Sequence, residues 1–347
     1  MFGLTPLALR TSARANGVSQ LHGAVSRQMW APLFDGAAVD GVPIGHVTNG
    51  VHARTWIAPE LQALLGEVGV RAADAPAEQQ WERALELDDA ALWRAHRQRK
   101  RALGDVVAER AGRFVDPDVL TLGFARRFAT YKRAGLLFSQ PARLARLLAD
   151  PERPLQIVVA GKAHPADDGG KELIRTVTHA AKELRADGRV VFVEDYDMEL
   201  ARHLVAGVDV WLNTPRRPLE ASGTSGMKAG MNGVLNCSIL DGWWAEGYGP
   251  QVGWAVGEGY EAASEEDQDA HDAESLFRLL EDEIVPMFYA RGDGALPSRW
   301  LELMKASIAD VGARFNTHRM VCDYAERYYG PAHREAAAIG SATASAA

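Results

Sequence analysis

The sequence predicts an α/β protein built on a doubly wound parallel sheet, and three observations carry this prediction. Short apolar runs rich in β-branched residues recur from residue 118 onward, and helix-like segments of roughly ten to fifteen residues separate most of them. The composition, 47% hydrophobic and 24% charged, is that of an ordinary globular protein. Parallel strands need long crossovers and are buried on both faces, so this alternation favours a parallel sheet covered by helices. The expected strands are 119–124, 155–160, 190–193, 208–212 and 234–240.

The segments on either side of the sheet are expected to be helical. A long helix is predicted at 88–114, and further helices at 274–329. The first sixty residues look like the end of a lobe whose beginning is absent, because two apolar helices start at once with no strand of their own to pack on. The expected parts are 1–60, the end of an incomplete N-terminal lobe; 61–114, a helical connection; 115–295, a Rossmann-like domain; 296–332, C-terminal helices; and 333–347, a flexible tail.

The charge and the cysteine content exclude several classes of protein. The net charge of -8 repels polyanions, so nucleic acid is not an expected partner and any phosphate site must be built from local cations and backbone amides. No apolar stretch approaches the roughly 18 residues of a membrane span, and the first residues lack a signal-peptide layout, which favours the cytoplasm and no membrane. Cys237 and Cys322 are too few for a disulfide framework or a Cys-based zinc site, and no metal is expected.

A basic run lies within the expected long helix. It comprises Arg94, Arg97, Arg99, Lys100 and Arg101. A run of cations on a helix is most often a solvated face, so we expect these side chains to lie in water.

The loop after strand 208–212 is the first candidate site. In doubly wound sheets, ligands bind beyond the carboxyl ends of the strands. This loop is rich in small residues and opens a helix, so N–H groups near Gly223 to Gly226 can converge on an anion. The P-loop pattern does not fit, because Ala229 follows Lys228 where that motif needs Ser or Thr. From the residues alone, a glycine turn that caps an ordinary helix remains the alternative.

The loop after strand 119–124 is the second candidate site. It places four cations within eight residues, at 126–133. Arginine offers bidentate contacts to a dianion and lysine offers a point charge. On charge alone, an exposed surface loop remains the alternative.

The run EASGTSGMKAGMNG at 220–233 closely resembles the cofactor-lysine motif of the α-glucan phosphorylases, the glycosyltransferase family of glycogen, starch and maltodextrin phosphorylases. The resemblance implies that Lys228 carries pyridoxal 5'-phosphate, and that Thr224 and Ser225 hold the cofactor's phosphate. The positions that it places against the sugar hydroxyls and the incoming phosphate are Glu220, Ala221, Ser222 and Gly223.

Other segments resemble the same family. The string at 127–133 is similar to its R-x-x-x-Y-K-R segment, which implies that Arg127 and Lys132 grip inorganic phosphate. Arg126 stands where a cation for the cofactor phosphate is commonly Lys. The segment at 48–56 resembles T-N-G-x-x-x-R-x-W and makes Asn49 a sugar-hydroxyl ligand, while 194–196 resembles E-N-Y and places Tyr196 beside the cofactor. The DGWWAE run at 241–246 resembles the bacterial branch.

The resemblance implies an activity and an architecture. The activity is phosphorolysis, in which inorganic phosphate cleaves the terminal α-1,4-glucosyl bond of a glucan and releases glucose 1-phosphate. The cofactor acts through its phosphate group, and the implied catalytic residues are Lys228, Arg127 and Lys132. The architecture is the C-terminal lobe of a two-lobed GT-B-type glycosyltransferase with a helical remnant of the N-terminal lobe. Only the C-terminal half of a family member is matched, so we expect a truncated chain that is weakly active at best alone.

Some questions stay open at this stage. The protein partner is either a second copy of the chain or a missing N-terminal lobe. One alternative function is a retaining glycosyltransferase of the same architecture that uses a nucleotide sugar and needs no lysine-bound cofactor. The other is a non-catalytic fragment that binds glucan.

Overall fold

The computed structural model describes residues 3–34, 37–72, 77–184, 188–291 and 296–345. Its centre is a six-stranded sheet in which every neighbouring pair of strands is parallel. The strand order is β5-β4-β3-β6-β7-β8, so the direction of winding reverses between β3 and β6. The bounds are β3 Leu120–Ala125, β4 Leu155–Ala160, β5 Val190–Val193, β6 Val210–Asn213, β7 Leu235–Ile239 and β8 Gly253–Val256.

The predicted α/β fold with a parallel sheet is confirmed, and all five expected strands are present within two residues of their predicted bounds. The sequence analysis missed β8. This strand has only four residues, begins at a glycine and lies at the edge of the sheet, where β7 is its one partner among the described strands. A run this short carries too little apolar pattern to stand out.

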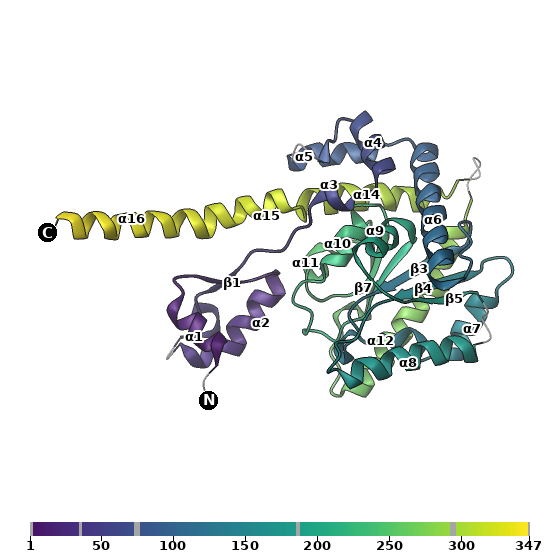
Figure 1. The fold of residues 1–347 in the computed structure, drawn as a ribbon, viewed down its shortest axis with the longest axis horizontal. Helices are drawn as coiled ribbons and strands as arrows, with labels where there is room; N and C mark the ends of the chain where they lie inside the picture. The colour runs from purple at the N-terminus through teal and green to yellow at the C-terminus, as the bar shows by residue number, and fades with distance from the viewer. Residues whose placement is uncertain (1–2, 35–36, 73–76, 185–187, 292–295, 346–347) are drawn as a thin grey trace.

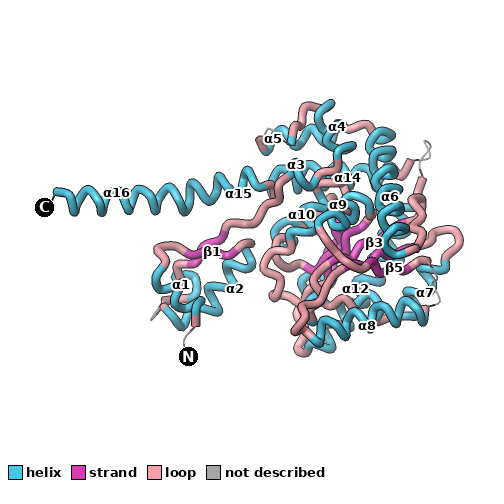
Figure 2. Tube along the Cα trace, in the orientation of Figure 1, coloured by secondary structure: helices cyan, strands magenta, loops and turns pink. Residues whose placement is uncertain are grey.

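Helices cover the sheet on both faces, and Figure 2 shows the strands between two helical layers. Helices α9, α10 and α14 contact β3, β6 and β7, while α7, α8 and α12 contact β4, β5 and β8. Strands β3 and β4 are buried along their whole length, and most of their residues are apolar. The buried polar side chains of Thr121 and Gln156 are hydrogen-bonded to each other, with Nε2 of Gln156 donating to Oγ1 of Thr121 at 2.8 Å. The bounds are α7 Pro141–Ala149, α8 Asp168–Glu183, α9 Met198–Gly207, α10 Thr224–Gly230, α11 Trp244–Gly247, α12 Glu265–Arg278, α13 Val285–Tyr289 and α14 Ser298–Arg314.

The expected long helix is α6, Asp89–Ala111, and it corrects one prediction about the basic run. Lys100 is not solvated: its side chain is 1% exposed, and its Nζ lies 2.5 Å from Oδ2 of Asp209 and donates to the carbonyl of Val119 at 2.8 Å. His96, one turn earlier, contacts Oδ1 of the same carboxylate at 2.8 Å. Residues four apart share one face of a helix, and this face packs against the sheet. Asp209 also accepts the backbone N–H of Thr121 at 2.7 Å, which ties α6 to β3 and to the start of β6.

The N-terminal residues form a small unit of their own, which stands beside the α/β body in Figure 1. The prediction that this segment contains no strands is wrong, because β1 and β2 form a parallel pair. Each has only three residues, too few to show a period of two in the sequence. The bounds are α1 Leu4–Thr11, β1 Ala15–Gly17, α2 Gln20–Trp30 and β2 Ile44–His46, followed by α3 Ala53–Trp56, α4 Pro59–Glu67 and α5 Glu78–Trp81 at the body.

The C-terminal helices extend away from the α/β body and pass the N-terminal unit (Figure 1). They are α15 Thr317–Tyr324, a π-helical turn at Ala325–Tyr329 and α16 Gly330–Ser345. The tail expected at 333–347 is thus helical as far as Ser345, and its many alanines account for this because alanine has the highest helix propensity. Within the described ranges, no helix is both long enough and apolar enough to cross a membrane.

Candidate active site

The loops that follow β3 and β6 meet at the carboxyl edge of the sheet, where the strand order reverses. The loop after β3 carries Arg126 and Lys132, and the loop after β6 carries Glu220. The Glu220 carboxylate accepts a hydrogen bond from Nη2 of Arg126 at 2.6 Å and contacts Nζ of Lys132 through the same oxygen. The side chains of all three are at most 11% exposed. The structure therefore brings together three of the residues that the sequence analysis selected, and we call them the Arg126–Lys132–Glu220 cluster.

The electrostatics of this cluster favour the binding of an anion. Burial alone would raise the pKa of Glu220, but the charges of Arg126 and Lys132 outweigh it and hold this pKa below its ordinary value. Two cations thus share one carboxylate, and the cluster is left with a net positive charge. Nη1 of Arg126 is buried and has no hydrogen-bond partner among the described residues. Because a buried guanidinium nitrogen seldom stays unpaired, this atom offers a free donor to a ligand.

Tyr196 lies near the same arginine. Burial raises the pKa of the Tyr196 hydroxyl, and the positive charge of Arg126 opposes this shift. The hydroxyl is therefore neutral and can donate a hydrogen bond at physiological pH.

Asp241, which the sequence analysis did not select, fixes the backbone around Glu220. Its Oδ2 accepts the backbone N–H of Glu220 at 2.9 Å, and its Oδ1 accepts that of Gly242 at 2.8 Å. The N–H of Trp243 donates to the carbonyl of Ser222 at 2.8 Å. The signal in the sequence is the position of Asp241 two residues after the end of β7, at the same edge of the sheet as Glu220.

The pKa of Asp241 predicts a measurable dependence of stability on pH. Burial raises this pKa from 3.8 to about 6. A pKa that is higher in the folded state adds stability at acid pH, and this contribution is lost as the pH rises through about 6. From pH 5 to pH 7.5, we expect the wild type to lose about 1.4 kcal/mol more of its unfolding free energy than Asp241→Asn does. Urea unfolding at the two pH values measures this difference, and equal losses in the two proteins would contradict it.

The residues expected to face sugar also contact the N-terminal unit. Nδ2 of Asn49 donates to Oγ of Ser222 at 3.2 Å, and Oγ of Ser19 donates to the carbonyl of Ala221 at 2.8 Å. Gly223 has a φ of +82°, a left-handed conformation that favours glycine, and it turns the chain into α10. The segment that carries Ala221 and Ser222 therefore meets the N-terminal unit here, and Asn49 lies beside Ser222.

Lys228 lies on α10 with its amine 3.6 Å from the centroid of the Trp56 ring. Burial lowers the pKa of this amine, so more of it is neutral and nucleophilic at a given pH than for an exposed lysine. Nδ2 of Asn232 donates to the carbonyls of both Lys228 and Trp56 at 2.8 Å, which fixes the two residues relative to each other. The sequence analysis assigned no role to Trp56 or to Asn232.

Thr224 and Ser225 form the first turn of α10. The N–H of Gly226 in this turn donates to the carbonyl of Gly223 at 3.2 Å, whereas the N–H groups of Thr224 and Ser225 have no acceptor among the described residues and can donate to a ligand. Oγ of Ser225 accepts a hydrogen bond from Nε1 of Trp211 at 3.2 Å, which links this turn to β6.

Arg127 and Arg133 differ from their neighbours on the loop. Arg127 is exposed, and no described residue forms a hydrogen bond or an ion pair with its side chain, so the structure does not bring it to the cluster. Arg133 is buried and serves the fold: it pairs with Asp272 at 2.7 Å and donates to the carbonyl of Thr214 at 3.0 Å. It thereby joins the loops after β3 and β6. No group of His, Cys, Asp and Glu within the described part of the chain is arranged to hold a metal ion.

Comparison with known proteins decides which family has this arrangement. A family model described as carbohydrate phosphorylase matches residues 2–248. The chain belongs to this family. The resemblance found in the sequence is therefore confirmed at the level of the phosphorylase family, an enzyme family of the glycosyltransferase class.

Several individual phosphorylases are similar to the chain in sequence. It is 44% identical to a maltodextrin phosphorylase of Thermococcus litoralis, over 95% of this chain and 41% of that protein. It is 43% identical to a glycogen phosphorylase of Aquifex aeolicus, over 96% and 50% respectively. A glycogen phosphorylase of Mycobacterium tuberculosis is 44% identical, over 95% and 40%. The chain thus spans half or less of the length of these phosphorylases.

Proposed function

We propose that this chain carries the phosphate-binding and cofactor-binding part of an α-glucan phosphorylase, which cleaves terminal α-1,4-glucosyl bonds with inorganic phosphate and releases glucose 1-phosphate. The observation that carries the proposal is the buried Arg126–Lys132–Glu220 cluster at the carboxyl edge of the sheet. Family membership and the names of the similar proteins support it. We further infer that the α/β body is the C-terminal lobe of a GT-B-type enzyme, and that 1–60 belongs to the other lobe.

The residues present fit pyridoxal 5'-phosphate. A half-buried amine with a lowered pKa is available at Lys228, and Arg126 offers an unpaired buried donor. Lys228 would hold the aldehyde carbon, while Arg126 and the first turn of α10 at Thr224 and Ser225 would hold the phosphate. Tyr196 would lie beside the ring. When bound, the cofactor supplies a phosphate group that can exchange a proton with the substrate phosphate.

The remaining residues bind and orient the substrates. Lys132, buried and fixed, supplies a preorganised charge for inorganic phosphate, and such charges act strongly where water is excluded. Arg127 has an exposed side chain that is free to turn toward an arriving anion and to contact it in a bidentate manner. Asn49, together with the 220–223 segment, offers amide, hydroxyl and backbone groups to the hydroxyls of a terminal glucosyl unit.

Glu220 competes with phosphate for the same cations, and this competition tests the proposal. The carboxylate occupies Arg126 and Lys132 in the absence of a ligand. Removing its charge by Glu220→Gln frees both cations, so we expect this variant to bind inorganic phosphate about tenfold more tightly than the wild type, whereas Lys132→Gln binds at least tenfold more weakly. Isothermal titration of the purified chain with inorganic phosphate measures both effects.

Lys162→Gln is the matched control, because the side chain of Lys162 is 59% exposed and its Nζ lies 3.8 Å from Oδ1 of Asp195, its one ion-pair partner among the described residues. It should bind phosphate as the wild type does. Equal affinities for wild type, Glu220→Gln and Lys132→Gln would contradict the proposal. Binding of a nucleotide sugar without any binding of inorganic phosphate would instead favour a nucleotide-sugar-dependent transferase.

A further inference from the structure

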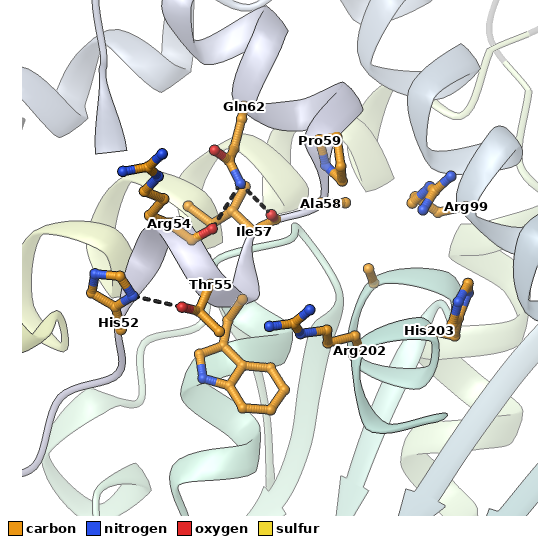
Figure 3. A pocket seen from close by; sticks show the side chains of 12 residues that line it. His52, Arg54, Thr55, Ile57, Ala58, Pro59, Gln62, Arg99, Arg202 and His203 are labelled. Carbon is orange, nitrogen blue, oxygen red and sulfur yellow. Dashed lines mark hydrogen bonds between the residues drawn. The ribbon is translucent and has the colours of Figure 1, made fainter. Parts of the chain in front are cut away.

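A separate cavity of about 600 Å³ lies between α3, the start of α4, α6 and α9, and Figure 3 shows the side chains that line it. Its ionisable lining residues all belong to the basic types. They are His52, Arg54, Arg99, Arg202 and His203. No carboxylate from the described part of the chain lines it. A concave space with one sign of charge focuses the field and concentrates ions of the opposite sign.

The cations of this cavity are only partly neutralised. Arg99 pairs with Glu60 at 2.6 Å through Nη2, but its Nε is buried and has no partner among the described residues. The side chain of Arg202 forms no hydrogen bond or ion pair with any described residue, and in Figure 3 its guanidinium points into the space below Thr55. Arg54 likewise has no described partner for its guanidinium. Glu60 thus neutralises Arg99, while Arg54 and Arg202 have no carboxylate partner among the described residues, so the cavity keeps a net positive charge.

Trp56 separates this cavity from the candidate active site. The indole lines the cavity and also carries the Lys228 amine 3.6 Å from its centroid. The Arg126–Lys132–Glu220 cluster contributes no residue to the lining. The cavity therefore adjoins the cofactor lysine without being part of the phosphate-binding cluster.

We propose that this cavity binds a phosphorylated small molecule. Several arginines in one pocket favour a dianion over a monoanion, and the guanidinium fork matches the geometry of phosphate oxygens. A volume of about 600 Å³ is sufficient for a group larger than free phosphate, such as a diphosphate or a sugar phosphate. This site is independent of the proposed function, because it shares no ligand-binding residue with it.

Isothermal titration with pyrophosphate, at low ionic strength, tests this site. We compare the wild type, Arg202→Gln and Lys132→Gln. We expect Arg202→Gln to weaken one binding event at least tenfold, and Lys132→Gln to leave that event unchanged. Repeating the titration with inorganic phosphate and with glucose 6-phosphate distinguishes a site for the free ion from a site for a phosphate ester. Because the cavity has room for more than a phosphate group, we expect glucose 6-phosphate to bind more tightly than inorganic phosphate.

Arg94→Gln is the matched control, because Arg94 is an exposed arginine on α6 outside the cavity and its loss changes the net charge equally. An unchanged thermal unfolding curve shows that Arg202→Gln remains folded. The proposal is overturned if Arg202→Gln binds pyrophosphate as tightly as Arg94→Gln does. It is also overturned if Lys132→Gln abolishes all binding, because the anion then occupies the cluster at the sheet edge.

Discussion

Replacing Asp209 by asparagine is expected to lower the unfolding free energy by about 3–5 kcal/mol. The carboxylate is fully buried, and burial alone would raise its pKa, but the charge of Lys100 and the hydrogen bond with His96 hold this pKa below its ordinary value. Asparagine has nearly the same shape but no charge, so Lys100 would stay in the interior without a counter-charge. Urea unfolding followed by circular dichroism measures the change.

Two further variants show whether charge is the cause. Asp118→Asn is the surface control, because Asp118 is 64% exposed and pairs with Arg97 at the surface, and we expect a change within about 0.5 kcal/mol. Adding Lys100→Met to Asp209→Asn removes the stranded ammonium and should restore part of the lost stability. If the single Asp209→Asn variant is as stable as Asp118→Asn, the buried ion cluster does not hold α6 to the sheet.

The central strands could be predicted because each of them is a short, mostly apolar run of contiguous residues. Five of the six residues in the LQIVVA run of β4 are apolar, as expected for a strand that is covered on both faces. The short strands β1, β2 and β8 could not be found this way, since three or four residues do not define a period. Their pairing depends on partners elsewhere in the chain.

The burial of Lys100 shows a second limit of prediction from local sequence pattern. A basic run on a helix looks the same in sequence whether one of its members faces water or the sheet. The deciding partner, Asp209, lies 109 residues away, so local pattern carries no information about it. A lysine at a position four residues after His96, on the face with Leu92 and Leu103, was the available hint.

The sequence predicted which residues belong to the candidate site, but it did not predict which of their side chains contact one another. The motifs at 126–133 and 220–228 named Lys132 and Glu220, and the parallel sheet explains why two loops 88 residues apart meet. The exposure of Arg127 was not predictable, because neighbouring cations on one loop point in directions set by the backbone. The supporting contacts of Asp241 and Asn232 were missed for a different reason. Each of these side chains binds backbone groups of a segment that is distant in the sequence.

Lys228 is the position where we expect the largest functional effect. Lys228→Met keeps the length and the apolar stem of the side chain but removes the amine, so the packing on Trp56 is largely retained. We expect this variant to lose covalent capture of pyridoxal 5'-phosphate completely while its unfolding free energy stays close to that of the wild type. Borohydride reduction followed by intact-mass measurement detects the captured group. Lys162→Met, at an exposed site, should capture the cofactor as the wild type does.

Peptide mapping of the wild-type chain, after incubation with less than one equivalent of pyridoxal 5'-phosphate and reduction with borohydride, tests the central claim most directly. The lowered pKa of Lys228 leaves more of its amine neutral than that of an exposed lysine at the same pH. We predict that the pyridoxyl mass is found on the peptide that contains Lys228 and is absent from the peptides of exposed lysines such as Lys162. A label spread over exposed lysines, with Lys228 unmodified, would contradict the account.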